Sequence, residues 1–576
     1  MKFRVCSAAL SLLPLVLLAC APMPPDPPVS RSSQSGRDKP PLKILSWQAP
    51  TILNPHLSTG FKDAEASRIT LEPLATFNRQ GQLIPFLAET IPSPDNGGVA
   101  ADGKSVIWKL KSGLQWSDGQ PFSADDVVFT YDFIRNPQTG ATSAGSYEAI
   151  ATVEALDSQT VKITFKEPTA AWFLPFVGSE GMILPKHIYQ NYVGEQARQA
   201  PANLRPIGTG PYRVSDFKPG DVVLYEANPH FREPDALGFQ QVELKGGGDA
   251  TSAARAVLQT GEADFAFNLQ VENQILQSLD KGTNGKVVTD LGTLSERIVF
   301  NFSDPDAKRT DGDRSSVKFP HPFLQDPLVR QAIALGIDRA LIAQQLYGVT
   351  GQATANILLL PQEFASPNTG YRFNPAQAEQ LLDQAGWQDS NGNGIRDKNG
   401  VEMQIVFQTS VNPLRQKSQQ VIKQTLQSMG IGVELKSIDP SVLFSGDPAN
   451  PDSLERFYAD LTMFTTGNTS PDPTKYLKTF TCAEIPQANN NWSGDNVGRY
   501  CNPEYDRLWQ LSLTALDPSK RQQLFITMND LLVNDYALVP LVHRADVVGV
   551  SNPLMGVALT PWDRNTWNIK DWHWQN

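Results

Sequence analysis

The stretch at residues 108–134, WKLKSGLQWSDGQPFSADDVVFTYDFI, constrains the fold more than any other part of this chain. Apolar side chains at alternate positions of residues 106–110 predict a strand with one mostly polar face. Gly119 ends a predicted turn, and Ser123 with Asp126 has the spacing of a helix capping box. The stretch therefore predicts a strand, a turn and a capped helix. It contains no nucleophile, base or set of metal ligands, so we interpret it as architecture.

Length and charge restrict the class of protein. A chain of 576 residues is too long for one ordinary hydrophobic core and is expected to form at least two lobes. The formal net charge of −11, without a basic stripe, argues against nucleic acid as a partner.

The start of the chain has the pattern of a secretory signal. Lys2 and Arg4 precede a mostly apolar stretch that ends at Ala19, which is shorter than a membrane-spanning helix. We predict a signal peptide at residues 1–19. Cys20 follows Leu-Leu-Ala, which resembles a bacterial lipoprotein cleavage box and predicts lipidation of Cys20; a chance cysteine is the alternative. Residues 20–41, rich in Pro and Ser, are predicted to be a tether.

The cysteines support an oxidising compartment. Cys6 leaves with the signal and Cys20 carries lipid, so Cys482 and Cys501 remain in the body. We expect these two to form a disulfide, with two free buried thiols as the alternative.

Hydrophobic periodicity further along the chain predicts alternating strands and helices, as in an α/β protein. The predicted strands are residues 42–47, 160–165, 212–214, 298–302, 433–436 and 537–543. The predicted helices are residues 326–347, 374–386 and 418–429. We take residues 298–302 and 537–543 as two crossings between lobes. The tail beyond them holds Trp562, Trp567, Trp572 and Trp574, for which packing is favoured over a sugar-binding platform.

Three motifs resemble a known family. Residues 108–134, the GTGPY at residues 208–212 and the string PFLQDPLVRQAIALGIDRALI at residues 322–342 are similar to the solute-binding proteins of ABC importers for peptides and nickel, family 5. The resemblance covers residues 40–576.

The resemblance implies an α/β fold of the two-lobed, periplasmic binding protein-like kind (class II), with an extra subdomain in lobe 1 and two hinge crossings. The implied boundaries are residues 42–75, 206–300 and 541–576 for the main domain of lobe 1, 76–205 for the extra subdomain and 301–540 for lobe 2.

The implied function is that of an extracytoplasmic lipoprotein, periplasmic and membrane-anchored, that captures peptides in a deep cleft by lobe closure and delivers them to ABC permease subunits. Oligopeptides are favoured over dipeptides, and a monomer without cofactors is expected. The alternatives are a non-peptide ligand (an oligosaccharide or a nickel complex), a sensor or a chaperone. A periplasmic hydrolase is disfavoured, because no hydrolase or phosphate-loop motif occurs.

The candidate ligand contacts follow from the same resemblance. Residues 463–477 resemble the family's cleft segment, in which short-peptide binders place an aspartate before an x-D-P turn; here Asn468 and Thr469 precede Pro-Asp472-Pro. Residues 409–415 lie where dipeptide binders carry a carboxylate-pairing arginine, and only Arg415 remains nearby. The candidate ligand residues are Asn54, Thr59, Asn412, Arg415, Gly467, Asn468, Thr469, Asp472 and Trp492; packing is an equal alternative for Trp492.

Metal sites have weaker support. Asp389, Asn391, Asn393 and Asp397 have the spacing of half a calcium loop, but Gly400 stands where a bidentate Glu is expected, so a plain turn is favoured. The six histidines are scattered singly, which lowers the weight of the nickel alternative.

Overall fold

The computed structural model of this chain describes residues 40–58, 60–308, 314–445 and 449–575. The predictions for the signal peptide, for Cys20, for most of the tether and for Thr59 therefore lie outside the described residues. We use lobe 1 and lobe 2 with the boundaries given above, which stay a prediction. No helix in the described part of the chain is both long and apolar enough to cross a bilayer.

One mixed sheet runs through both lobes, in the order β16-β15-β17-β11-β18-β10-β1-β9-β8-β7, with β12 paired to β18. Its strands are β1 (Leu42–Ser46), β7 (Tyr212–Lys218), β8 (Val222–Ala227), β9 (Gln241–Gly246), β10 (Phe265–Ala266), β11 (Gly285–Phe300), β12 (Gly351–Ala353), β15 (Gln404–Ser410), β16 (Gly432–Ile438), β17 (Leu461–Thr466) and β18 (Leu538–Ser551). In lobe 1, β1 is parallel to β9 and β10, and in lobe 2, β15 is parallel to β16 and β17.

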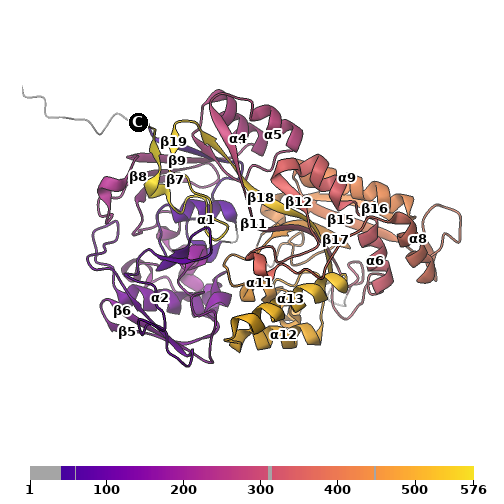
Figure 1. Cartoon of the computed structure of the whole chain (residues 1–576), viewed down its shortest axis with the longest axis horizontal. Coiled ribbons are helices and arrows are strands. Elements are labelled where there is room, and N and C mark those ends of the chain that lie inside the picture. The colour runs from indigo at the N-terminus through magenta and orange to yellow at the C-terminus, as the bar shows by residue number, and fades with distance from the viewer. Residues whose placement is uncertain (1–39, 59, 309–313, 446–448, 576) are drawn as a thin grey trace, which may run out of the picture. The chain divides into compact units, whose positions relative to one another are not determined.

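The antiparallel pair β11 and β18 connects the lobes, and both strands are longer than the crossings predicted from the sequence (Figure 1). Residues 285–291 pair with 545–551, and residues 295–299 pair with 538–543. Between these two regions the register breaks, so that residues 292–294 of β11 lie opposite the single residue Arg544. A break of this kind bends the paired strands and marks the place where the lobes meet.

In lobe 2, helices cover both faces of the sheet. At the end of β11 that pairs with β17 of lobe 2, the alternation of side chains sends Ile298 into one core and Val299 into the other. The helices are α6 (Pro327–Leu335), α7 (Arg339–Ile342), α8 (Pro375–Gln384), α9 (Pro413–Ser428), α10 (Pro440–Leu443), α11 (Thr474–Lys478), α12 (Pro503–Thr514) and α13 (Pro518–Asn534). Six of them begin with an Asn or Asp cap followed by proline, which needs no backbone donor at that position. The hairpin β13 (Asp397–Lys398) and β14 (Val401–Glu402) completes the described part of this lobe.

The prediction of a single helix at residues 326–347 is wrong. It is divided into α6, α7 and a π-helical turn at Ala343–Tyr347. The physical reason is a second cap, because the Asp338 carboxylate accepts a hydrogen bond from the Leu341 N–H and starts a new helix.

The helices of lobe 1 are α1 (Phe61–Arg68), α2 (Ala124–Arg135), α3 (Lys186–Tyr189), α4 (Ala250–Arg255) and α5 (Asn273–Leu279). Two small sheets pair β2 (Ala75–Phe77) with β3 (Leu83–Pro85) and β19 (Leu554–Met555) with β20 (His573–Trp574). A further sheet has the order β4-β6-β5. The last comprises β4 (Ser105–Lys109), β5 (Ile150–Asp157) and β6 (Thr160–Phe165). The predicted strand, turn and helix at residues 106–134 are confirmed as β4 and α2. The Asp126 carboxylate accepts the Ser123 N–H at 2.9 Å, and Trp108 is fully buried.

The C-terminal tail packs on lobe 1, as predicted. Trp572 is fully buried, with its ring centroid 4.7 Å from that of Phe265. Trp562 is buried in the core of the extra subdomain. For these two tryptophans, packing is therefore the role that the structure assigns.

Candidate functional site

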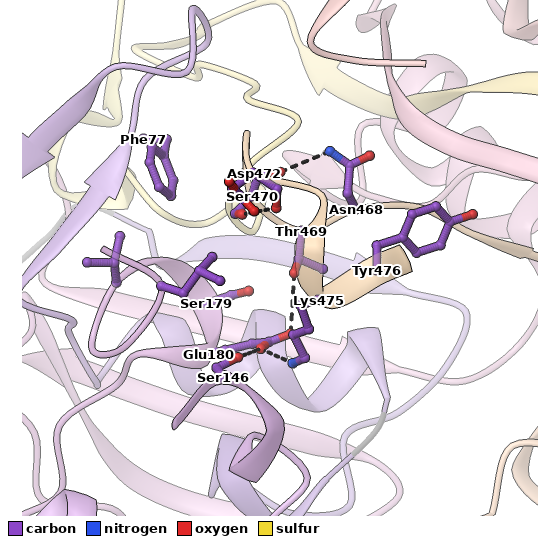
Figure 2. Close-up of a pocket in the computed structure, with 12 residues that line it drawn as sticks. Phe77, Ser146, Ser179, Glu180, Asn468, Thr469, Ser470, Asp472, Lys475 and Tyr476 are labelled. Carbon is purple, nitrogen blue, oxygen red and sulfur yellow. Dashed lines mark hydrogen bonds and ion pairs between the residues drawn. The ribbon is translucent and has the colours of Figure 1, made fainter. Parts of the chain in front are cut away.

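A small cavity lies where the extra subdomain of lobe 1 faces the segment that follows β17 in lobe 2 (Figure 2). Lobe 1 supplies residues from β2 and from two short 3-10 helices, Ala144–Tyr147 and Gly178–Glu180. Lobe 2 supplies the loop from Asn468 to Asp472 and the start of α11. Three of the predicted ligand residues, Asn468, Thr469 and Asp472, line this cavity.

Glu180 is the acidic centre of the cavity. Its carboxylate accepts hydrogen bonds from Ser146 Oγ at 2.9 Å and Thr469 Oγ1 at 3.3 Å, and it forms an ion pair with Lys475. Burial alone would raise the pKa of Glu180, but the Lys475 ammonium and Ser146 outweigh burial and lower the pKa. Glu180 is therefore an ionised carboxylate in lobe 1 whose partners Thr469 and Lys475 belong to lobe 2.

The second carboxylate of the cavity, Asp472, is engaged within lobe 2. It is 6% exposed, forms an ion pair with Arg521 and accepts the Thr474 N–H at 2.9 Å. Asn468 next to it is 2% exposed and donates from its amide nitrogen to the carbonyls of Leu360 and Ser470. The amide oxygen of Asn468 has no hydrogen-bond partner among the described residues. Buried acceptors are normally satisfied by a donor or an ordered water molecule, so this oxygen is an exception next to the cavity.

The backbone before this loop is closely packed. A Cβ on Gly467 would lie 2.2 Å from the carbonyl oxygen of Thr293, in the segment of β11 where the register breaks. Gly467 therefore lets the cleft segment approach the hinge, and its predicted ligand contact stays a prediction.

Two other predicted residues lie in lobe 2 and belong to a buried polar network. Arg415 donates to Glu296 at 2.9 Å, to Ser410 Oγ at 2.8 Å and to Thr465 Oγ1 at 3.0 Å. Glu296 is 1% exposed, so the pair lies inside the protein. Asn412 caps α9, and its amide nitrogen donates to Gln270 of lobe 1 at 2.9 Å. Ligand contacts by Arg415 and Asn412 stay predictions.

Asn54 and Trp492 do not line this cavity. Asn54 is fully buried and donates to Asn203 at 2.9 Å. Trp492 is 7% exposed, and its ring lies 4.2 Å from the guanidinium carbon of Arg456, which is the packing alternative. Sequence reasoning missed Glu180 and Ser146, which lie in segments without charge pairing or clear periodicity. Lys475 lies inside the predicted segment at residues 463–477.

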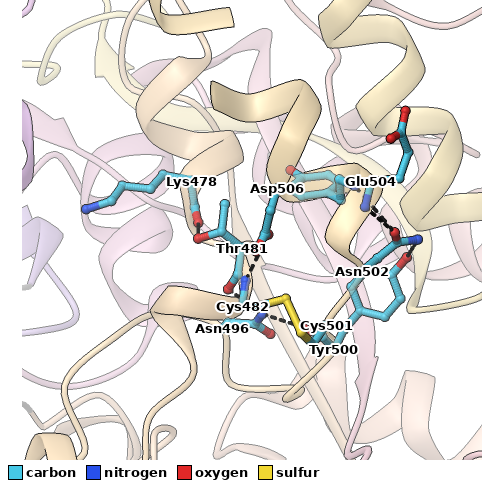
Figure 3. Close-up of a disulfide and its surroundings, with 10 residues drawn as sticks. Lys478, Thr481, Cys482, Asn496, Tyr500, Cys501, Asn502, Glu504 and Asp506 are labelled. Carbon is cyan, nitrogen blue, oxygen red and sulfur yellow. Dashed lines mark hydrogen bonds between the residues drawn. A yellow bond between two sulfur atoms is a disulfide. The ribbon is translucent and has the colours of Figure 1, made fainter. Parts of the chain in front are cut away.

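The predicted disulfide is confirmed. Cys482 and Cys501 are joined, with their Cα atoms 4.7 Å apart, beneath the start of α12 (Figure 3). The Cys482 N–H donates to Asp506 at 3.0 Å, which ties the bridge to that helix.

The loop with calcium-like spacing is organised by its own hydrogen bonds. Asp389 accepts the N–H groups of Gly392 and Gly394, at 2.7 and 2.9 Å, and Asp397 accepts the N–H and hydroxyl of Ser390. Among the described residues no group of three or more His, Cys, Asp or Glu side chains could hold a metal ion. A calcium site formed by Asp389, Asn391, Asn393 and Asp397 stays a prediction.

The cavity around Glu180 is much smaller than the deep cleft expected between the lobes. The cavity has a volume of about 20 Å³, which suits one or two water molecules rather than a peptide. The reason is that side chains from the two lobes meet directly: Lys475 pairs with Glu180, and Lys478 pairs with Glu148 at 2.8 Å. The two lobes are therefore in direct contact on this side of the cavity.

The fold and the cavity define a class. Two α/β lobes joined by a pair of crossing strands, with polar side chains of both lobes meeting between them, are the architecture of two-lobed periplasmic binding proteins. Residues 82–486 match the family described as bacterial extracellular solute-binding proteins, family 5 Middle. The chain belongs to this family.

Individual relatives agree over nearly the whole chain. The oligopeptide-binding protein AppA of Bacillus subtilis is 27% identical over 545 residues, which cover 94% of this chain and 92% of AppA. A dipeptide-binding protein of Pseudomonas aeruginosa is 24% identical over 552 residues, 91% of this chain and 93% of that protein.

Solved structures give the same picture of the fold. AppA from Bacillus subtilis in complex with a nonapeptide has a TM-score of 0.76 at 25% identity and covers 93% of this chain and 99% of AppA. NikZ from Campylobacter jejuni in complex with Ni(L-His) has a TM-score of 0.78 at 24% identity and covers 92% and 99%. The latter likeness shows the fold alone.

Proposed function

We propose that this chain is the substrate-binding lipoprotein of an ABC importer, and that it captures peptides between its lobes and delivers them unchanged to a membrane permease. Membership of the extracellular solute-binding family supports the transport role. The relatives named for oligopeptides and a dipeptide, and the complex of AppA with a nonapeptide, support peptides as the ligand class.

The single observation that carries this proposal is the position of the predicted ligand segment. Asn468, Thr469 and Asp472 of lobe 2 line the cavity opposite Glu180 of lobe 1. A ligand held there contacts both lobes only when they are close together, so binding shifts the population toward the closed form.

Oligopeptides are favoured over dipeptides because of what stands at residue 468. Asn468 offers an amide where short-peptide binders carry a carboxylate, so the ligand's amino terminus gains less there from charge. An extended peptide can instead gain affinity through its main chain, which hydrogen-bonds without regard to side-chain identity.

The test is to purify the full-length lipoprotein in detergent from its native membrane, denature it and identify the released small molecules by mass spectrometry. We expect peptides of several residues in about one copy per protein. Release of a sugar or a nickel complex instead would refute peptides as the ligand class. Shortening of added synthetic peptides during incubation would refute a role without chemistry.

Membrane anchoring through Cys20 is part of the proposal and rests on the pattern of the first 41 residues. Labelled palmitate fed to the expressing cells should appear in the protein, and Cys20→Ser should abolish the label. Cys6→Ser is the matched control and should leave the label unchanged, since residue 6 is removed with the signal. Label that persists in Cys20→Ser would contradict the anchor.

A further inference from the structure

A second small cavity, of about 10 Å³, lies beside the register break of β11 and β18. Lobe 1 contributes the loop after β10, including Asn268 and Gln270, and lobe 2 contributes Tyr347, Thr350 and Leu414. Arg544 of β18 lines it from the crossing itself. The cavity is therefore at the junction of the lobes, apart from the one that contains Glu180.

Arg544 has far fewer hydrogen bonds than its chemistry requires. A guanidinium has five N–H donors and no acceptor. The Arg544 residue is 9% exposed, and among the described residues its side chain makes one long hydrogen bond, from Nη2 to Asn268 Oδ1 at 3.4 Å. Its Nε is buried without a partner within the same part of the chain. Buried donors are normally satisfied, so this arrangement points to an acceptor that enters the cavity.

The nearby carboxylates of Glu296 and Asp546 are not the missing hydrogen-bond acceptor of Arg544. Glu296 is engaged by Arg415 and Thr465, and it also accepts the Tyr347 hydroxyl at 3.4 Å. Asp546 forms a side-chain hydrogen bond with Asn565. Both acidic groups act on Arg544 only through their charge, and neither forms a hydrogen bond with it among those of the described residues.

We propose that Arg544 is a carboxylate-binding subsite for the ligand, which receives either the free C-terminus of a peptide or an acidic side chain. The planar fork of a guanidinium matches a carboxylate with two parallel hydrogen bonds, and a buried fork loses little entropy on binding. This inference rests on the proposed function and extends it to the position and charge of one ligand group.

The cavity must widen to accept that group, because about 10 Å³ suits one water molecule. Its walls belong to different lobes and can separate. They are joined by the Asn412–Gln270 hydrogen bond at 2.9 Å and the Lys417–Glu272 ion pair at 2.7 Å, both partly exposed to water. Opening of the lobes thus exposes Arg544 to an entering ligand.

The test compares three random pentapeptide libraries on the full-length protein in detergent. The first lacks Asp and Glu and has free C-termini, the second is the same library as C-terminal amides, and the third is an amide library that contains Glu. Retained peptides are measured by quantitative mass spectrometry. We expect the neutral amides to bind about tenfold or more weaker than the better of the other two libraries, as for loss of a hydrogen-bonded charged group.

The other libraries identify the source of the carboxylate. Tight binding by free acids assigns the C-terminus to Arg544, and tight binding by Glu-containing amides assigns a side chain. Equal binding of all three libraries would overturn the inference while the proposed function stands. Binding by none of them would refute peptides as ligands, and the inference with them.

Variants tie the effect to Arg544. Arg544→Gln should abolish the preference for a carboxylate, so that the three libraries bind alike, whereas Arg544→Lys should keep part of the preference. Arg507→Gln, at an exposed arginine of α12, is the control and should behave as the unaltered protein. A preference that persists in a folded Arg544→Gln protein would overturn the inference. If Arg544→Gln does not fold, the inference is tested by Arg544→Lys and by the comparison of the three libraries on the unaltered protein.

Discussion

Two lysines form ion pairs between the lobes, and their removal should favour an open conformation. Lys475 pairs with Glu180, with side chains 29% and 28% exposed, and Lys478 pairs with Glu148, with side chains 20% and 49% exposed. Ion pairs this accessible to water contribute about 0.2–1 kcal/mol each. Loss of both in Lys475→Met/Lys478→Met should therefore raise the ratio of open to closed molecules by roughly 2- to 30-fold.

The assay is small-angle X-ray scattering of the ligand-free protein, in which opening increases the radius of gyration. Added salt should open the unaltered protein in the same direction, because screening weakens exposed pairs, and should have less effect on the double variant. Lys436→Met is the matched control: Lys436 pairs with Asp452 at 2.8 Å inside lobe 2, with similar exposure, and its loss should not change the shape. Equal scattering by the double variant and the unaltered protein at low salt would refute this reasoning.

Three further predictions concern stability. Arg415→Met leaves Glu296 buried without its cation and should lower the free energy of unfolding by about 3–5 kcal/mol in denaturant titrations. Arg507→Met, at an exposed ion pair, should change the free energy of unfolding by under about 1 kcal/mol. Similar losses in both variants would contradict a stabilising role for the buried pair. Cys482→Ser/Cys501→Ser removes the crosslink between residues 19 apart in sequence and should lower the free energy of unfolding by about 3 kcal/mol in the chain-entropy model. Reduction of the disulfide in the unaltered protein should lower it by the same amount. An unchanged denaturation midpoint would be evidence against this prediction. Burial raises the pKa of Glu65 to about 7, above its unfolded value, so the stability contributed by protonated Glu65 is complete below the unfolded pKa and is lost as pH rises through about 7. Glu65→Gln should therefore flatten the decline of the free energy of unfolding over that pH range. An unchanged slope would count against this assignment.

The sequence predicted the local elements well where one rule dominated. The Ser123 and Asp126 pair predicted the start of α2, and Asp or Asn followed by Pro predicted the starts of α6 and α8, because capping depends on residues close in the chain. The division of residues 326–347 was missed, since a second cap at Asp338 competes with continued helical periodicity.

The candidate site was only half predictable, because its two sides come from distant parts of the chain. The lobe 2 side, around Asn468 and Asp472, was found through resemblance to a family segment. Glu180 was missed because only the meeting of the lobes brings it to Lys475, 295 residues away. Arg415 was proposed for a ligand carboxylate, but its donors are used by Glu296 and its neighbours, and burial of a side chain cannot be read from spacing.

The most direct test of the account is whether peptide changes the distance between the lobes. Dyes attached at Leu156→Cys in β5 and Val401→Cys in β14, both exposed positions, report this distance by single-molecule fluorescence transfer. The free protein should show open and closed populations, and a saturating peptide should shift molecules to the closed population and remain chemically intact. Peptide that binds without changing the two populations, or that is recovered cleaved, would contradict the account.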